Sequence, residues 1–579
     1  RREMLKRYGE DTYTAGYQVV TSLDSRMQKA SNYALRNGLL EFTRRRGYRG
    51  PLSKIDLSEE LLSLPPKTWP LETLEPLNQY APGGLSLAVV AEIFENNNVK
   101  IIFQDGGDEI LPWSGLSWAS SFIDRENRGP SPKSVKEILA IGDVIYVMPT
   151  TNGTWALAQI PDAQAALVSM DPYDGAIAAL TGGFDYTTSK FNRARQAYRQ
   201  PGSAFKPFIY SAALEHGNTT ATVVLDAPVV ISSAELEAIW RPINYSGRFY
   251  GPTRMREALV RSMNLVSVRL LLFETGIRNA VKHIKNFGFN DATLIKNGSL
   301  ALGGGDASVL DMAQGYAIIA NGGYGIKPYI INSIFSSKGE TLYQAKPAVV
   351  CHECLEKGSE KPIIVEEFAA ERALNREMML EEIANVVDSY RPTAIDAPEL
   401  FEHINAAPQS ITPQNAYLVQ DMMRDVVRRG TGIRARRELG RSDLSGKTGT
   451  SNDRRDAWFG GFNADIAAVV WVGYDDSQPL GPKEEGSRTA LPIWIEFARI
   501  ALENIPEHQM PMPEGIVSVR INKETGCPAR ASQSNVIFEV FRENNVPQCE
   551  QFDEIADPFN NAAEADSTSK KDNGSESLF

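Results

Sequence analysis

The chain has 579 residues, a length that exceeds one ordinary domain and indicates about two to four domains. Its content of 42% hydrophobic and 23% charged residues is typical of a folded globular protein. A net charge of −12 argues against a general nucleic-acid-binding protein, because such proteins usually present a basic surface.

The N-terminal part carries no recognisable export or membrane signal. Nothing at the start resembles a signal peptide, and no run reaches the roughly 20 apolar residues that span a bilayer. Arg1-Arg2-Glu3-Met4 reads as the interior of a longer protein.

Alternation predicts a strand over 13–23, and an apolar stripe at helical spacing predicts a helix over 25–44. Frequent Gly and Pro residues over 47–84 predict an irregular connection.

Short strand-like runs separated by turn residues dominate the next stretch. Several short strands within so few residues predict a small barrel or sandwich. The runs are Leu87–Ile93, Val99–Phe103, Val144–Met148 and Thr154–Ile160, with turn residues at 96–98, 105–108 and 150–153.

From Ala165 onward the pattern mixes strands with helices. Charged, irregular residues over 350–410 predict an insertion, and the polar stretch after Pro558 predicts a disordered tail. The predicted elements are a strand–turn–strand unit over 165–180, helices over 205–288, a helix over 309–319 and strands over 456–474.

Three short motifs stand in this region in a fixed order. They are Ser203-Ala204-Phe205-Lys206, Ser262-Met263-Asn264 and Lys447-Thr448-Gly449-Thr450. Each motif alone is weak, because S-x-x-K and S-x-N arise by chance in long chains. Together, and in this order, they form the active-serine signature of penicillin-binding proteins and β-lactamases.

Ser203 is the predicted nucleophile. Pro201 and Gly202 interrupt regular structure directly before it, so we expect Ser203 to open a helix with Lys206 on the same face. The free N–H groups and partial positive charge at a helix start favour an anion there. Pro207 fits the first turn of such a helix.

The base that activates Ser203 is predicted to be Lys206. A serine needs a base, yet none of the five histidines lies in a recognisable catalytic motif and Ser203 is not in a G-x-S-x-G elbow. A Ser–Lys scheme fits better. The pKa of Lys206 must then fall well below about 10.4, which partial burial and the cation of Lys447 would achieve.

The remaining motif residues have predicted roles around Ser203. We expect Ser262 to relay a proton toward the leaving group and Asn264 to hold Lys206 and a substrate amide. An edge strand at Lys447–Thr450 would pair with an extended peptide, and Gly449 would leave room for it. The hydroxyls of Thr448 and Thr450 would bind a terminal carboxylate, and the N–H of Thr450 would complete an oxyanion hole with that of Ser203.

The four cysteines form two groups, Cys351/Cys354 and Cys527/Cys549. Their even, sparse number is compatible with an oxidising compartment, and both disulfides and free thiols remain open. A zinc site at Cys351-His352-Glu353-Cys354 is disfavoured, because no second pair of ligands lies nearby. We therefore expect no metal and no cofactor.

The segments around the motifs resemble the class A penicillin-binding proteins, most closely the 1A type of Gram-negative bacteria. The resemblance covers most of the chain. It is carried by Asn192-Arg193-Ala194, Arg199 to Pro207, Tyr250-Gly251-Pro252, Arg256 to Asn264, Gly446 to Thr450, Asp456-Ala457-Trp458-Phe459 and Pro492-Ile493-Trp494.

The resemblance implies a multidomain fold. An interdomain linker region over 1–84 and a small OB-like β-barrel insert over 85–162 would precede an α/β main domain of the serine β-lactamase/transpeptidase type over 163–555, with the tail at 556–579. It also implies an N-terminal membrane anchor and a glycosyltransferase domain. We find neither in this chain and expect both in a full-length parent that also polymerises glycan strands.

The implied activity is peptidoglycan DD-transpeptidation in cell wall biogenesis. Ser203 would form an acyl-enzyme with a stem peptide and release the terminal D-Ala, and an amine of a neighbouring stem would accept the acyl group. Water as acceptor would make the enzyme a D-Ala-D-Ala carboxypeptidase, and β-lactam antibiotics would acylate Ser203. The implied location is the periplasmic side of the inner membrane. An outer-membrane lipoprotein activator and a second copy of the chain are further implied partners.

Two other functions are disfavoured. A β-lactamase shares the motifs, and Glu371-Arg372-Ala373-Leu374-Asn375 matches its E-x-x-L-N string, but this string lies in a charged helical stretch far along the chain from Asn264. A β-lactam sensor acylates once and signals, but it needs a transmembrane signalling region and usually lacks the linker and the OB-like insert.

Overall fold

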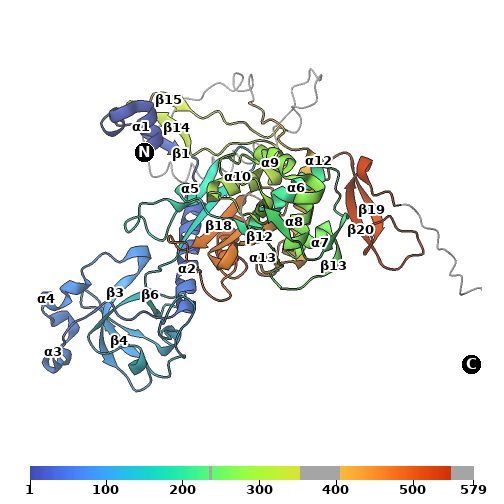
Figure 1. Ribbon diagram of the computed structural model, residues 1–579. Coiled ribbons are helices and arrows are strands. Elements are labelled where there is room, and N and C mark those ends of the chain that lie inside the picture. The colour runs from blue at the N-terminus through green and yellow to red at the C-terminus, as the bar shows by residue number, and fades with distance from the viewer. Residues whose placement is uncertain (234–237, 352–404, 550–579) are drawn as a thin grey trace, which may run out of the picture.

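The computed structural model describes residues 1–233, 238–351 and 405–549. Figure 1 shows a smaller β-rich body joined through a long helix to a larger body, with a hairpin at the far edge. The predicted insertion lies largely outside the described residues, and Glu371-Arg372-Ala373-Leu374-Asn375 and the predicted tail lie wholly outside them. Within the described ranges, no helix is both long and apolar enough to cross a membrane.

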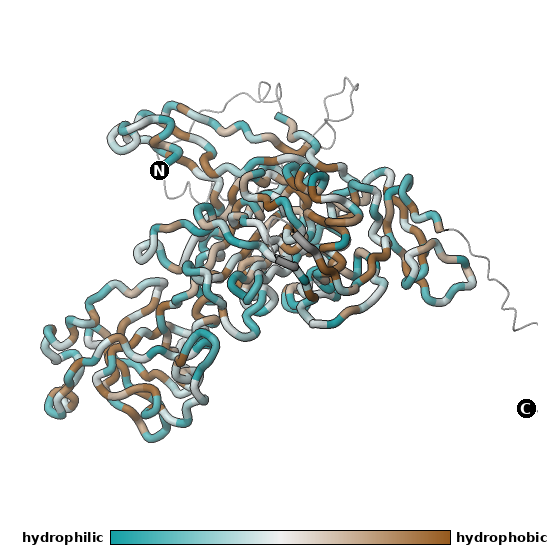
Figure 2. Tube along the Cα trace, in the orientation of Figure 1, coloured by the Kyte–Doolittle hydropathy of each residue, from teal (hydrophilic) through white to brown (hydrophobic). Residues whose placement is uncertain are grey.

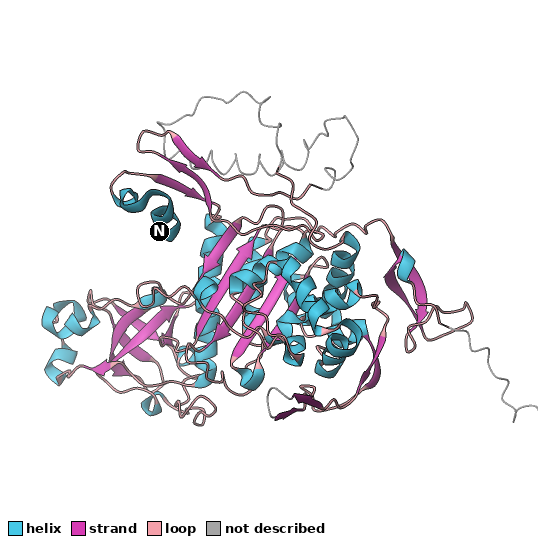
Figure 3. Cartoon of the chain, turned by 45° about the horizontal axis from the view of Figure 1, so that its top comes forward, coloured by secondary structure: helices cyan, strands magenta, loops and turns pink. Residues whose placement is uncertain are grey.

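A five-stranded antiparallel sheet forms the centre of the larger body (Figure 3). β17 and β18 confirm the strands predicted over 456–474, and β8 and β9 confirm the unit over 165–180. The strands in spatial order are β16 (Ser445–Thr450), β17 (Asp456–Phe462), β18 (Ala467–Gly473), β8 (Gln164–Met170) and β9 (Ile177–Thr181). The third motif therefore lies on β16, an edge strand.

Helices cover both faces of this sheet, so its central strands are apolar on both sides. On β18, Val469 and Trp471 join one hydrophobic core, whereas Val470 and Val472 join the other. This division follows from the alternation of side chains along a strand. The hydrophobic interior is visible as brown segments at the centre of the larger body in Figure 2.

One face is covered by α2 (Ser25–Arg46), α13 (Ile433–Leu439) and α14 (Ala490–Ala501). α2 confirms the helix predicted over 25–44, and the Asp24 side chain caps it by accepting from the Met27 N–H at 2.9 Å. Ala34, Leu35 and Leu39 of α2 are fully buried. This helix is thus a core element of the larger body as well as the connection to the smaller one.

The other face carries the predicted helices. The helix predicted over 309–319 is present as α10, and a capping box formed by Ser308 and Asp311 stabilises its N-terminus. The helices are α5 (Arg193–Gln196), η7 (Gly202–Phe205), α6 (Lys206–Glu215), α7 (Met255–Val260), α8 (Asn264–Arg269), η8 (Leu270–Thr275), α9 (Ile277–Ile284), η9 (Lys285–Phe287), η10 (Gly298–Leu302), α10 (Val309–Ala320) and α12 (Pro413–Arg429).

The prediction of helices over 205–288 is wrong for its middle part. Four short strands interrupt the helices, forming two antiparallel pairs. They are β10 (Val223–Asp226), β11 (Ile231–Ser233), β12 (Ala238–Trp240) and β13 (Gly251–Arg254), with β10 paired to β13 and β11 to β12. Alternating burial along β10 explains the pairing, because a half-buried strand needs a period of two rather than 3.6.

The smaller body confirms the four strands predicted between residues 85 and 160. Its strands are β2 (Ser53–Lys54), β3 (Ser86–Ile93), β4 (Val99–Ile102), β5 (Asp108–Leu111), β6 (Asp143–Pro149) and β7 (Trp155–Ala158), with the short helices η5 (Trp113–Gly115) and η6 (Val135–Glu137). β5 begins where a turn was predicted, because its exposed residues are mostly polar. In the described residues no pairing joins β5 to β2 or β7, so the sheet is open rather than a closed barrel.

The predicted irregular connection over 47–84 packs onto this smaller body. Trp69, Leu74 and Leu77 share a buried cluster with Val89 and Ile102 of its sheet. The connection contains short helical turns: α3 (Glu59–Ser63), η2 (Pro66–Thr68), α4 (Leu71–Leu74), η3 (Glu75–Leu77) and η4 (Pro82–Gly84).

Two peripheral units complete the chain. The strand predicted over 13–23 is present but shorter than predicted, as β1 (Gln18–Thr21), and it pairs with residues more than 300 positions away. It forms a small sheet with β14 (Ile331–Phe335) and β15 (Thr341–Gln344). The helices α1 (Arg2–Tyr8) and η1 (Gly9–Tyr13) precede β1. A hairpin of β19 (Ile516–Asn522) and β20 (Val536–Arg542), for which no prediction was made, is followed by η14 (Glu543–Asn545). A disulfide joins Cys527 to Cys549, and Cys351 is also disulfide-bonded.

Candidate active site

Ser203 lies in a tight turn that leads into α6. The turn is the 3-10 helix η7, and Lys206 is the first residue of α6, with Pro207 in its first turn. The predicted helix start is therefore present, although Ser203 is in a 3-10 rather than an α-helical turn. Because residues three apart eclipse one another in a 3-10 turn, Ser203 and Lys206 lie on one side of it.

Two glycines let this turn approach the edge strand closely. A Cβ on Gly202, whose φ is +54°, would lie 2.4 Å from the Thr450 oxygen. A Cβ on Gly449 would lie 2.5 Å from the Pro201 oxygen. The sequence predicted that Gly449 makes room for a peptide substrate; in the structure the space beside Gly449 is taken by the backbone of the nucleophile turn.

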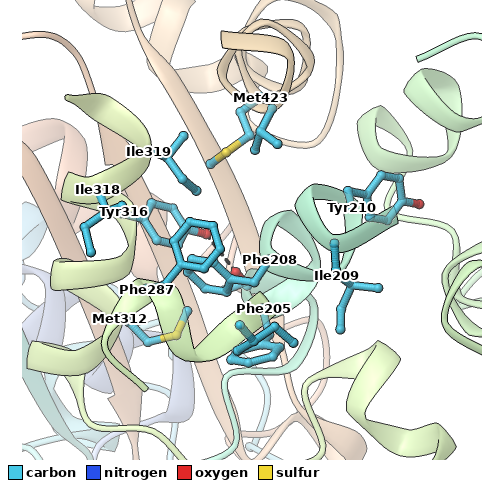
Figure 4. Packing of buried hydrophobic residues seen from close by; sticks show 14 of the residues in the cluster. Phe205, Phe208, Ile209, Tyr210, Phe287, Met312, Tyr316, Ile318, Ile319 and Met423 are labelled. Atoms are coloured by element: carbon cyan, nitrogen blue, oxygen red, sulfur yellow. Dashed lines mark hydrogen bonds between the residues drawn. The ribbon is translucent and has the colours of Figure 1, made fainter. Parts of the chain in front are cut away.

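Aromatic packing holds the turn and α6 from beneath. Figure 4 shows Phe208 between Phe205, Phe287 and Tyr316, with ring centroids 4.9 to 5.8 Å apart. The buried Tyr316 hydroxyl donates to the Ala204 oxygen at 2.8 Å. Ser203 is therefore attached to a rigid core, as a nucleophile that must hold one position requires.

The second motif forms the turn between α7 and α8. Ser262 adopts a φ of +57°, a left-handed conformation that is uncommon for residues other than glycine. Its N–H donates to the Leu259 oxygen at 3.0 Å, and the Asn264 N–H donates to the Asn244 side chain at 2.9 Å. Asn244 is fixed in turn by both carboxylate oxygens of Asp226. Strain of this kind persists only where the surroundings over-determine it.

Lys206 is fully buried and faces the second motif. Its Nζ donates to the Ser262 oxygen at 2.8 Å, the Met263 oxygen at 3.0 Å and Asn264 Oδ1 at 2.8 Å. The predicted contact between Lys206 and Asn264 is thus present. Burial, followed by the charge of Lys447, lowers the pKa of Lys206 well below its usual value. Among the described residues, no hydrogen bond joins the Ser203 hydroxyl to Lys206.

Lys447 of β16 contacts the same motif. Its Nζ donates to Ser262 Oγ at 2.8 Å and to the Thr448 oxygen at 3.0 Å. Its side chain is fully buried, and burial lowers its pKa to about 7. The two lysines, Ser262 and Asn264 therefore form one connected group beside the nucleophile turn.

The two threonines of the third motif have partners that sequence reasoning missed. The Thr448 hydroxyl lies 2.7 Å from the Thr431 hydroxyl, and Thr450 Oγ1 accepts from the Gly486 N–H at 3.1 Å. Asn244, Thr431 and Gly486 lie in loops outside the motifs, 20, 17 and 36 positions from the motif residues that they contact. Their residue types carry no local signal of their own, so only the fold reveals them.

The residues before Ser203 are tied to β17. Arg199 Nε donates to Asp456 at 2.7 Å, and Trp458 Nε1 donates to the Gln200 oxygen at 2.9 Å. The described histidines lie elsewhere: buried His283, for example, contacts the Ser211 hydroxyl at 2.8 Å in the core behind α6. The geometry thus offers lysines and hydroxyls, rather than an imidazole, for proton transfer beside Ser203.

Comparisons with known proteins identify relatives over nearly the whole chain. The family described as penicillin-binding protein OB-like domain matches residues 48–163, and the family described as penicillin binding protein transpeptidase domain matches residues 165–353. Penicillin-binding protein 1A of Pseudomonas aeruginosa is 40% identical over 94% of this chain and 64% of its own length. Penicillin-binding protein 1A of Escherichia coli K12 is 32% identical over 96% of this chain and 67% of its own length.

A solved structure agrees with these matches. The crystal structure of penicillin-binding protein 1A from Haemophilus influenzae superposes with a TM-score of 0.77 at 31% identity, covering 95% of this chain and 75% of that one. The chain spans 64% of the length of the Pseudomonas relative, which is less than two thirds.

Proposed function

The chain belongs to the penicillin-binding protein 1A family, and on this premise we propose that it is a serine-type D-Ala-D-Ala transpeptidase of peptidoglycan with Ser203 as its nucleophile. The observation that carries the proposal is the convergence of three distant motifs. Lys206, Ser262, Asn264 and Lys447 form one hydrogen-bonded group beside the turn that holds Ser203.

The first step is acylation of Ser203. Its hydroxyl oxygen attacks the carbonyl carbon of the penultimate D-Ala, and its proton passes to Lys206 Nζ. Lys206 can accept it only in the neutral form, which burial and Lys447 favour. The three oxygens around Lys206 favour the protonated form instead, so the amine must turn from one of them toward Ser203. Such catalytic contacts often tighten only when substrate binds.

Ser262 and Lys447 then supply a proton to the leaving group. The C–N bond to the terminal D-Ala breaks, and the departing amine takes a proton through the Ser262 hydroxyl. Lys447 Nζ lies 2.8 Å from that hydroxyl and can restore its proton. In a β-lactam the same step opens the ring, and the leaving amine stays attached to the acyl group.

The developing oxyanion would lie between the N–H groups of Ser203 and Thr450. The close approach of the nucleophile turn to β16, which Gly202 and Gly449 permit, supports this pairing. Losing one such donor typically costs about 3 kcal/mol of transition-state stabilisation. β16 is an edge strand, so an extended stem peptide can pair with it. The hydroxyls of Thr448 and Thr450 would then bind the terminal carboxylate of that peptide.

Deacylation decides between the candidate activities. An amine of a second stem peptide gives a cross-link, and water gives a carboxypeptidase. A β-lactamase would release hydrolysed antibiotic many times, and a sensor would acylate once without releasing D-Ala. The proposal for this chain is transfer to the amine.

The test is to treat the protein with penicillin and locate the adduct by mass spectrometry. We expect one adduct on Ser203, none in Ser203→Ala, and release of D-Ala from a pentapeptide together with transfer to an amine acceptor. Rapid repeated turnover of a cephalosporin, or an adduct on another residue, would overturn the proposal.

Broader aspects of the proposal rest mainly on the resemblance to the family. They are a location on the periplasmic side of the inner membrane, a parent protein with a membrane anchor and a glycan-polymerising domain, an activator lipoprotein and a dimer. Location is also supported by substrate chemistry, since peptidoglycan is cross-linked outside the cytoplasmic membrane.

A further inference from the structure

The C-terminal hairpin β19–β20 supplies a buried carboxylate to the larger body. The hairpin follows both matched family ranges in the sequence, and Figure 1 shows it at the edge opposite the smaller body. Glu539 of β20 is only 2% exposed. A buried carboxylate is costly unless it is paired and hydrogen-bonded, so its partners define what it does.

The partners of Glu539 are two buried arginines at the start of α7. Arg254 Nη1 donates to Glu539 Oε2 at 3.1 Å, and Arg256 Nε donates to both carboxylate oxygens at 2.9 Å. Arg256 also binds two carboxylates of α12, Asp421 at 2.6 Å and Asp425 at 3.3 Å. Although burial alone would lower the pKa of Arg256, these carboxylates raise it, so its guanidinium stays charged.

α7 connects Arg256 rigidly to Ser262. The helix spans Met255–Val260, and the Ser262 N–H donates to the Leu259 oxygen at 3.0 Å. A second connection supports the same end of α7: the Arg256 N–H donates to the Thr220 oxygen at 3.0 Å, and the Thr220 hydroxyl donates to the Val540 oxygen of β20 at 2.8 Å. The hairpin thus contacts the start of α7 directly through the Glu539 side chain, and its backbone is connected to the same place by way of Thr220.

α12 connects the same arginine to the strand that carries Lys447. The Ser445 hydroxyl of β16 donates to the Gln420 oxygen of α12 at 3.1 Å. Just beyond the end of α12, the Thr431 hydroxyl lies 2.7 Å from the Thr448 hydroxyl. Arg256 therefore lies between the helix that leads to Ser262 and the helix that supports Lys447.

We propose that Glu539 is a positioning residue that, through Arg256, fixes α7 against α12 and so keeps Ser262 within hydrogen-bond distance of Lys447. This inference rests on the proposed function. Without the Glu539 charge, Arg256 would be drawn toward Asp421 and Asp425, so α7 would shift relative to α12 and carry Ser262 away from its position beside Lys447. Because Ser262 acts in proton transfer, the acylation step should slow while the binding of the antibiotic is retained.

The test compares Glu539→Gln, which keeps the shape but removes the charge, with Glu539→Asp, which keeps the charge. Stopped-flow kinetics with a chromogenic cephalosporin separate the acylation rate constant from the dissociation constant of the initial complex. We expect Glu539→Gln to slow acylation about tenfold with a dissociation constant within about twofold of wild type, as a small displacement of a catalytic group would. Glu539→Asp should recover part of the rate.

The matched control is Arg520→Gln on β19, whose guanidinium, among the residues that the structure describes, donates to carbonyl oxygens of the hairpin's own loop and to no other group. We expect it to acylate at the wild-type rate. Equal acylation rates in Glu539→Gln and wild type, or an equal loss in Arg520→Gln, would overturn the inference. If Glu539→Gln does not fold, Asp421→Asn, which removes another carboxylate that binds Arg256, replaces it in the test. We then expect the same slower acylation with an unchanged dissociation constant. Failure of wild type to acylate at Ser203 would instead overturn the proposed function.

Discussion

Lys447 Nζ lies 2.8 Å from Ser262 Oγ, although the two residues are 185 positions apart in the sequence. The contact brings a second buried lysine into the site that already holds Lys206, and both side chains are fully buried. Two neighbouring buried cations repel one another, so the charge on one governs the proton affinity of the other.

The pH dependence of acylation should report this coupling. Lys206 must be neutral to accept the Ser203 proton, so the acylation rate rises as pH increases through the pKa of Lys206. Lys447→Met removes the neighbouring positive charge. The pKa of Lys206 then rises, and the acidic limb of the profile should move to higher pH, in addition to a large loss of rate.

The measurement is the second-order rate constant for labelling by a fluorescent penicillin as a function of pH. Lys338→Met, which removes an exposed charge in the turn between β14 and β15, is the control and should leave the profile in place. A limb that stays at the wild-type pH in Lys447→Met would show that Lys447 does not influence the proton acceptor.

Gly449→Ala should disable the site by displacing the nucleophile turn. The new Cβ would lie 2.5 Å from the Pro201 oxygen and 2.9 Å from the Ala204 nitrogen, and both are backbone atoms that cannot rotate away. Overpacking of this kind typically costs about 1–3 kcal/mol. We expect acylation to fall at least about tenfold, as measured by penicillin labelling.

Gly432→Ala provides the steric control for this prediction. A Cβ at Gly432 would meet its nearest atoms at 3.4 to 3.5 Å, which is ordinary contact. Its labelling rate should equal that of wild type. Wild-type labelling by Gly449→Ala would mean that the turn and the strand tolerate a wider separation.

Thr431→Val should weaken binding rather than chemistry. The Thr431 hydroxyl lies 2.7 Å from that of Thr448, and removing it leaves Thr448 free to rotate. One hydrogen bond is worth about 1 kcal/mol, so the dissociation constant of the initial penicillin complex should rise about fivefold. The acylation rate constant should remain unchanged, and Thr431→Ser should restore binding. A slower acylation step with unchanged binding would contradict this role.

The sequence allowed the central strands, the main helices and the motif residues to be predicted, because their signals are local. Apolar periodicity identifies β18 and α10, and the Ser203-to-Lys206 spacing places both side chains on one turn. The strand β5 was not predicted because three of its four residues are exposed and two of these are acidic, so it shows no apolar alternation. No prediction covered β20, although five of its seven residues are apolar.

The partners of the motif residues could not be predicted, because they depend on how loops and helices pack together rather than on a local sequence pattern. Asn244 fixes the start of α8 from a loop, and Thr431 meets Thr448 only because α12 lies against β16. Gly449 shows the same limit in another form. Its place in the motif was evident, but the group that occupies the space beside it became clear only from the fold.

Stability should reveal the burial of Lys447 independently of catalysis. Its pKa is about 7 in the folded protein and 10.5 for an ordinary lysine. Between these values the unfolded chain binds more protons than the folded one, so the free energy of unfolding rises with pH. Burying Lys447 is therefore most destabilising below about pH 7, and this cost disappears above the ordinary pKa.

Lys447→Met removes this titration and leaves a side chain of similar length that can be buried without charge. We expect the variant to unfold at a higher urea concentration than wild type at pH 7, with the difference shrinking as the pH approaches 10, although it has lost acylation. The accompanying rise in the pKa of Lys206 acts in the same direction, since it lowers the cost of burying that lysine. Urea midpoints of the two proteins that stay parallel from pH 7 to pH 10 would contradict a lowered pKa of Lys447 in the folded state.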